Sequence, residues 1–164
     1  MESKKNILWI HSMNYGLIAG GAYILTALLF LFINPGIVLN GITVWLVIVI
    51  LAMTLGADKY LKKAAITTNT FFKAYLTGLL ICFFANIVAG FYNFLYYYMF
   101  NREAFNKMLQ DIQENSAASG VNGEIGEYIT PLNYSLSIII FLTLFGSIIA
   151  IFTALFIILR RKKH

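Results

Sequence analysis

Four long runs of apolar residues, separated by short polar segments, organise the whole chain. A helix needs about 20 apolar residues to cross a bilayer, and each run reaches that length. Backbone amide and carbonyl groups inside lipid must hydrogen bond within their own segment, so each run is expected to be helical. The pattern predicts an all-α polytopic membrane protein forming a single domain, residues 1–164, with transmembrane helices at residues 9–33, 37–57, 71–100 and 136–159.

The segment between the third and fourth runs, residues 101–135, has a different pattern. In NREAFNKMLQDIQEN, the apolar residues Phe105, Leu109 and Ile112 recur at helical spacing, with Met108 beside them. One apolar stripe on a polar helix is typical of an amphipathic helix that lies in the membrane interface or caps a bundle. The stretch SAASGVNGEIGE that follows is rich in Ser and Gly, and is expected to be a flexible loop.

Composition supports the membrane interpretation. Hydrophobic residues make up 60% of the chain and charged residues only 12%, against roughly 25% charged residues in soluble domains. The first run is too long for the apolar region of a secretory signal, so we expect it to be retained as a helix. The one cysteine, Cys82, lies in the middle of the third run and is expected to act as a small buried apolar residue.

The charged residues divide unequally between the two sides of the predicted topology. Ten of the twelve basic residues fall on the side that holds both termini and the connection between the second and third runs. The segment 101–135 holds two basic and five acidic residues, a net charge of −3. The positive-inside rule therefore predicts that both termini are cytoplasmic. These basic residues are expected to contact the anionic lipids of the inner leaflet, and not nucleic acid.

Three basic residues near the ends of the predicted spans, Lys73, Arg160 and Arg161, are interpreted as interfacial anchors. Lys73 lies inside the third run, and a charge at membrane depth is a functional candidate by default. Thr70, however, is a candidate N-cap, which places Lys73 in the first helical turn. Helical side chains lean toward the helix N-terminus, so this ammonium group is expected to reach the lipid headgroups. A contact with a cytoplasmic partner is the alternative.

Small residues and two asparagines define the expected packing faces, because membrane helices associate through small residues and interhelical hydrogen bonds. The second run is bulky, and we expect it to be the most lipid-exposed. Asn86 and Asn93 are expected to share one face of the third helix, either as hydrogen-bonding groups between helices or as the lining of a polar path. The full set is Gly16 and Gly20, a GxxxG pair, in the first run, Gly78, Asn86, Gly90 and Asn93 in the third, and Gly146 in the fourth.

The predicted spans lack the groups that most membrane chemistry uses. No Asp or Glu lies inside a span, and His11 lies at the inner end of the first one. Proton relays and cation sites in membranes rely on such groups. No His/Cys cluster with metal spacing, nucleophile with a base, or Gly-rich phosphate loop is present. We therefore expect no enzymatic activity, no catalytic residue, and no cofactor or metal site.

Four short stretches are informative together: Tyr15–Gly20, Gly56–Lys63, Thr70–Tyr75 followed by Gly78, and Gly146 followed by Arg160–Lys162. They resemble a bacterial family of small four-helix membrane proteins, a domain of unknown function named DUF4199. Phe72 stands where members of that family have a small residue. The resemblance implies a location in the inner membrane of a Gram-negative bacterium. It implies no activity, substrate or functional residue.

These features favour a structural or accessory role in an envelope assembly, with an envelope protein or further copies of the chain as partners. A small transporter or an oligomeric channel that uses the polar stripe of the third helix is the alternative. A membrane enzyme acting on lipid has support only from the tyrosines near the outer interface.

Overall fold

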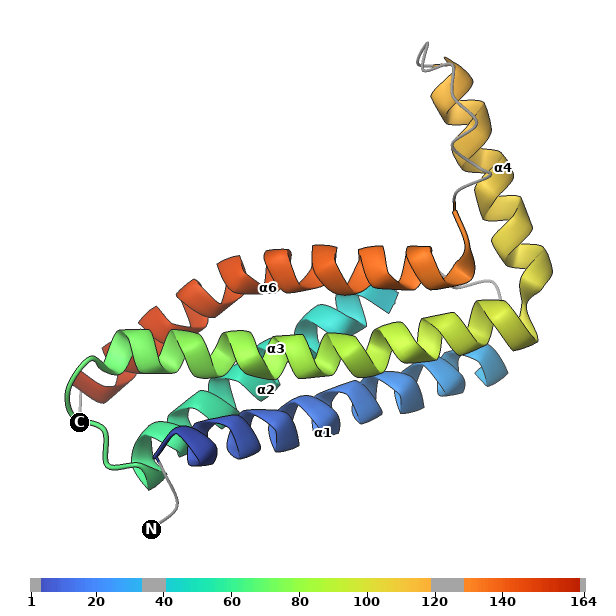
Figure 1. The fold of residues 1–164 in the computed structure, drawn as a ribbon. Helices are drawn as coiled ribbons and strands as arrows, with labels where there is room; N and C mark the ends of the chain where they lie inside the picture. The colour runs from blue at the N-terminus through green and yellow to red at the C-terminus, as the bar shows by residue number, and fades with distance from the viewer. Residues whose placement is uncertain (1–3, 34–40, 119–128, 163–164) are drawn as a thin grey trace.

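The computed structural model describes residues 4–33, 41–118 and 129–162. All regular structure in these residues is helical, which confirms the predicted all-α class. In Figure 1, the long helices form a bundle, and α4 turns steeply away from one of its ends. The elements are α1 (Lys4–Ile33), α2 (Gly41–Lys63), α3 (Thr70–Leu95), the π-helical segment η2 (Tyr96–Phe100), α4 (Arg102–Ala118) and α6 (Pro131–Lys162).

Four helical stretches are long and apolar enough to cross a membrane. One falls in each of the four apolar runs, as expected for a multi-pass membrane protein. The first residues of the second predicted span, 37–40, and most of the expected flexible loop lie outside the described residues. The four stretches are Asn6–Phe30, Ile42–Lys63, Thr70–Phe100 and Pro131–Arg161.

The start of α3 differs from the sequence prediction. The N-cap is Asn69, and the expectation that Thr70 fills this position is wrong. Asn69 adopts a left-handed conformation, with φ 51° and ψ 37°, which asparagine tolerates better than most residues. Its backbone oxygen accepts a hydrogen bond from the Lys73 amide at 3.1 Å. Helix α3 therefore begins at Thr70, and Lys73 still lies in its first turn.

The other end of the third apolar helix is also irregular. The last five residues form η2, and the Asn101 amide donates to the backbone oxygen of Tyr96, five positions earlier, at 2.9 Å. The Asn101 side chain then accepts a hydrogen bond from the Ala104 amide at 3.1 Å, which caps α4. The extra residue in the π-helical turn changes which side chains share a face. The chain leaves the bundle and enters α4 at this point.

Helix α3 is the centre of the bundle, and glycines bring its neighbours close. A Cβ atom added at Gly16 of α1 would lie 2.7 Å from the Ile81 backbone oxygen, and one at Gly20 would lie 3.1 Å from the Ala85 oxygen. A Cβ atom at Gly146 of α6 would collide with the Cys82 sulfur. Glycine at these positions therefore allows α1 and α6 to approach α3 more closely than any other residue would.

The expectation that α2 is the most lipid-exposed helix is wrong. Trp45, Val49 and Met53, spaced four residues apart along α2, are at most 2% exposed. They belong to one core cluster with Ile81 and Cys82 of α3. Bulky side chains on one helix fill the space beside small residues on its neighbour, so a mostly bulky helix can still be well buried.

Candidate functional site

A cluster of polar contacts inside the bundle is centred on the buried side chain of Asn86. We call Trp45, Cys82, Asn86 and Thr143 the Asn86 cluster. Trp45 Nε1 of α2 donates to Asn86 Oδ1 at 3.0 Å. Asn86 Nδ2 donates to Thr143 Oγ1 of α6 at 3.0 Å and lies 3.3 Å from Cys82 Sγ. Asn86 thus joins α2, α3 and α6 through one side chain that is 1% exposed.

These contacts satisfy both ends of the Asn86 amide. A buried polar group costs free energy unless it is hydrogen bonded, so the cluster stabilises the one arrangement that pairs all its members. Sequence reasoning singled out Asn86 but did not predict its pairing with Trp45 and Thr143. A tryptophan inside an apolar helix is a usable signal, because its buried indole N–H needs a partner.

Asn93 lies seven residues further along α3, in different surroundings. It lines an open cavity of about 430 Å³ at the end of the bundle nearest α4. Asn86 is not among the residues that line this cavity, whereas Trp45 and Ala89 are. The two asparagines therefore face the same side of α3 but are separated by packed side chains. The remaining lining residues are Tyr23, Ile42, Tyr97, Tyr134, Ser137, Ile138, Phe141 and Leu142.

An aromatic group closes the bundle beside this cavity. The ring centroids of Tyr97, Phe105 and Tyr134 lie 5.6, 5.7 and 6.0 Å apart, pair by pair. Phe105 of α4 is only 3% exposed, although most of α4 is polar. Edge-to-face contacts of this kind add to the free energy of burial. Phe105 therefore attaches α4 to the bundle.

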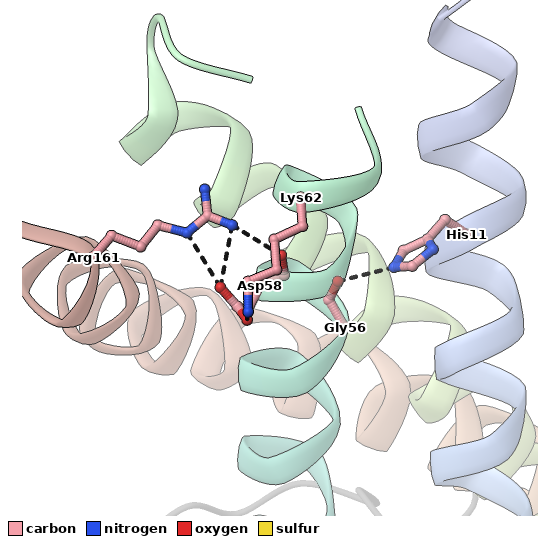
Figure 2. A network of polar contacts seen from close by, with 5 residues as sticks. All are labelled: His11, Gly56, Asp58, Lys62 and Arg161. Carbon is pink, nitrogen blue, oxygen red and sulfur yellow. Dashed lines mark hydrogen bonds and ion pairs between the residues drawn. The ribbon is translucent and has the colours of Figure 1, made fainter. Parts of the chain in front are cut away.

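A second polar cluster, drawn in Figure 2, lies at the opposite end of the bundle. Asp58 of α2 forms ion pairs with Lys62 at 2.7 Å and with Arg161 of α6 at 3.1 Å. Arg161 Nη2 also donates to the Asp58 backbone oxygen at 3.0 Å. His11 Nε2 of α1 lies 2.8 Å from the Gly56 backbone oxygen. These contacts tie the end of α2 to α1 and α6.

The predicted anchors share this end of the bundle, which we call the basic end. Arg160 is exposed and Lys73 is half-buried. Arg161 forms an ion pair with Asp58, which the sequence did not predict. Phe72 is 56% exposed, so the bulky residue found there does not disturb the packing. The anchor role of all three basic residues stays a prediction.

The remaining packing glycines divide between tight and ordinary contacts. A Cβ atom added at Gly90 would collide with the Ile139 side chain of α6. One at Gly78 would lie 3.5 Å from Ala150 Cβ, an ordinary contact distance. Within the described ranges, no three His, Cys, Asp or Glu side chains are grouped closely enough to hold a metal ion.

Comparison with models of protein families shows which family this chain belongs to. The model of a family described as "Protein of unknown function (DUF4199)" matches residues 14–158. The chain belongs to this family. The match covers α2, α3, α4, the later part of α1 and most of α6, and so includes both the Asn86 cluster and the cavity. Searches of curated proteins and of solved structures found no match to this DUF4199 member.

Proposed function

We propose that this DUF4199 protein is a structural or accessory component of a bacterial envelope assembly, embedded in the inner membrane and without catalytic activity of its own. The Asn86 cluster is the observation that supports this role most directly. The polar side chain best placed to line a path through the bundle has hydrogen-bond partners on two other helices, Trp45 and Thr143. Its polar atoms are therefore used for holding helices together.

The proposed topology has both termini in the cytoplasm. The first residues of α1 and the last residues of α6 lie at one end of the bundle, and α4 lies at the other (Figure 1). Lys62, Lys73 and Arg161 share the end that holds these termini, and an excess of basic residues is typical of the cytoplasmic side. Helix α4, directed away from the bundle axis, then lies at the outer surface as an amphipathic helix.

Impermeant thiol reagents test this topology directly. Cys82 is fully buried, so cysteines introduced as Lys63→Cys and Gln113→Cys can be labelled separately in intact cells. We expect labelling at Gln113→Cys before lysis, and labelling at Lys63→Cys only after lysis. The reverse order would overturn the orientation.

The accessory role predicts a partner at the outer surface. Gln113 of α4 is exposed and is suited to a photocrosslinking amino acid, whereas Leu144 of α6 is an exposed apolar control. We expect a discrete protein adduct from Gln113 in native membranes and none from Leu144. An adduct the size of two copies of this chain would identify the partner as a homo-oligomer. Failure to crosslink any protein from Gln113 would contradict the proposal.

A small transporter or oligomeric channel is the second candidate function. The cavity beside Asn93 favours it, because it is an open space with both polar and apolar lining residues. Flux measured in proteoliposomes separates the two candidates. A solute flux that Asn93→Leu abolishes would favour transport over the accessory role, whereas equal permeability of wild type, Asn93→Leu and empty vesicles would favour the accessory role.

A further inference from the structure

The cavity at the α4 end is built like a site for a single lipid molecule. We propose that it holds one acyl chain and the ester carbonyl of a glycerolipid from the leaflet on that side. The inference is independent of the accessory role proposed above, and it holds for either orientation in the membrane.

The polarity of the lining changes along the bundle axis. The hydrogen-bonding residues Asn93, Tyr97 and Tyr134 lie toward α4, because α3 ends and α6 begins there. Tyr23 lies at the same level, since its ring contacts that of Tyr92 at 6.5 Å. Further from α4 along the bundle axis the lining is apolar, and consists of Trp45, Ala89, Phe141 and Leu142. A lipid of the adjacent leaflet has the same order, with its ester groups at the surface and its chains inside.

The site has free hydrogen-bonding capacity but no charge. No Lys, Arg, Asp or Glu is among its described lining residues. The Asn93 side chain is half-buried in the lining, within a candidate membrane span, and has no hydrogen-bond partner within the described part of the chain. An unpaired amide there is costly unless a bound group accepts its hydrogen bond. An uncharged carbonyl acceptor fits this lining, whereas a phosphate or an ammonium group does not.

The opening of the cavity faces the side of the bundle between α2 and α6. Ile42 of α2 is 69% exposed and Phe141 of α6 is 66% exposed, yet both line the cavity. Side chains so exposed on the flank of a membrane helix contact lipid. A bilayer lipid can therefore enter sideways, without passing through water. The volume of about 430 Å³ lies in the range of sites for small ligands.

A photoreactive glycerolipid with a diazirine on one acyl chain tests the site in nanodiscs of phosphatidylethanolamine and phosphatidylglycerol. We expect the label on peptides from α3 and α6 that contain lining residues, with an excess of unlabelled diester lipid competing for it. A diether lipid of equal chain length lacks the carbonyl acceptor. We expect it to compete about two- to tenfold less well, the effect of one hydrogen bond.

Three variants test whether the lipid labelling depends on this cavity. Asn93→Leu should remove the preference for diester over diether lipid, because it removes the donor. Ser137→Trp should fill the cavity and reduce labelling, whereas Leu136→Trp, on an exposed neighbour outside the lining, should not. Uniform labelling of all apolar helices, or equal competition by diester and diether lipids in the wild type, would overturn the proposal. Stronger competition by a ubiquinone analogue than by diester lipid would overturn it in favour of a quinone.

Discussion

Arg161 binds Asp58 across 103 positions of the chain, through both the side chain and the backbone of the aspartate. Its Nε donates to Asp58 Oδ1 at 3.1 Å, and its Nη2 donates to the Asp58 backbone oxygen at 3.0 Å. Both side chains are about three-quarters buried, with relative exposures of 27% and 23%. This pair joins the end of α6 to the end of α2 at the basic end of the bundle.

Removing this pair should loosen the last turns of α6. We expect Arg161→Ala to lower the free energy of unfolding by about 1 kcal/mol, the upper range for ion pairs that retain contact with solvent. Amide hydrogen exchange should quicken at the end of α6 and stay unchanged in α3. Arg160→Ala, at the exposed neighbour, is the matched control and should have no effect. Equal effects of the two variants would show that the ion pair contributes nothing.

The Asn86 cluster should behave as one unit. Asn86→Leu leaves the indole N–H of Trp45 without its acceptor, so we expect a loss of roughly 1–2 kcal/mol in the free energy of unfolding. Trp45→Phe removes that N–H group. The double variant Trp45→Phe/Asn86→Leu should therefore be less destabilised than the sum of its two single variants. Detergent-induced unfolding measures all three. If the losses in the free energy of unfolding were strictly additive, the hydrogen bond between Trp45 and Asn86 would make no net contribution to stability.

The glycines of α1 provide a test of close packing with an internal control. A Cβ atom at Gly16 would lie 2.7 Å from a backbone oxygen of α3, which cannot move aside cheaply, whereas a Cβ atom at Gly21 would meet nothing within 4 Å. We expect Gly16→Ala to destabilise the bundle by about 1–3 kcal/mol through overpacking. Gly21→Ala should be neutral, or stabilising by up to about 1 kcal/mol, because alanine favours helix.

Thermal unfolding in detergent measures the difference. A neutral Gly16→Ala variant would mean that α1 does not pack against α3 as described here.

Phe105 should control whether α4 stays attached to the bundle. We expect Phe105→Ala to increase hydrogen exchange and protease cleavage throughout α4, because its 3%-exposed ring is the buried contact between α4 and the aromatic group with Tyr97 and Tyr134. The local cost is roughly 3 kcal/mol, as for other buried phenylalanines. Phe100→Ala, at a ring that is 79% exposed, is the control. Protection of α4 in Phe105→Ala equal to that in the control would contradict this role.

The helical class, the four apolar helices and the family could all be predicted from the amino-acid sequence. These follow from local properties: the length of an apolar run, the spacing of apolar residues, and short stretches of residue types. The same local information placed Lys73 in the first turn of α3, but it chose Thr70 as the N-cap where Asn69 takes the position in a left-handed conformation. Capping propensities of neighbouring residues are too similar for sequence to separate them.

Which residues from different helices contact one another is seen only in the folded bundle. The pairing of Asp58 with Arg161, and of Trp45 with Asn86, joins residues 103 and 41 positions apart. No periodicity within a helix predicts such pairs, because they depend on how two helices are rotated and shifted against each other. Spacing along α3 alone likewise predicted that Asn86 and Asn93 belong to one polar stripe. The structure separates them, because packed side chains bury Asn86, whereas Asn93 lines an open cavity.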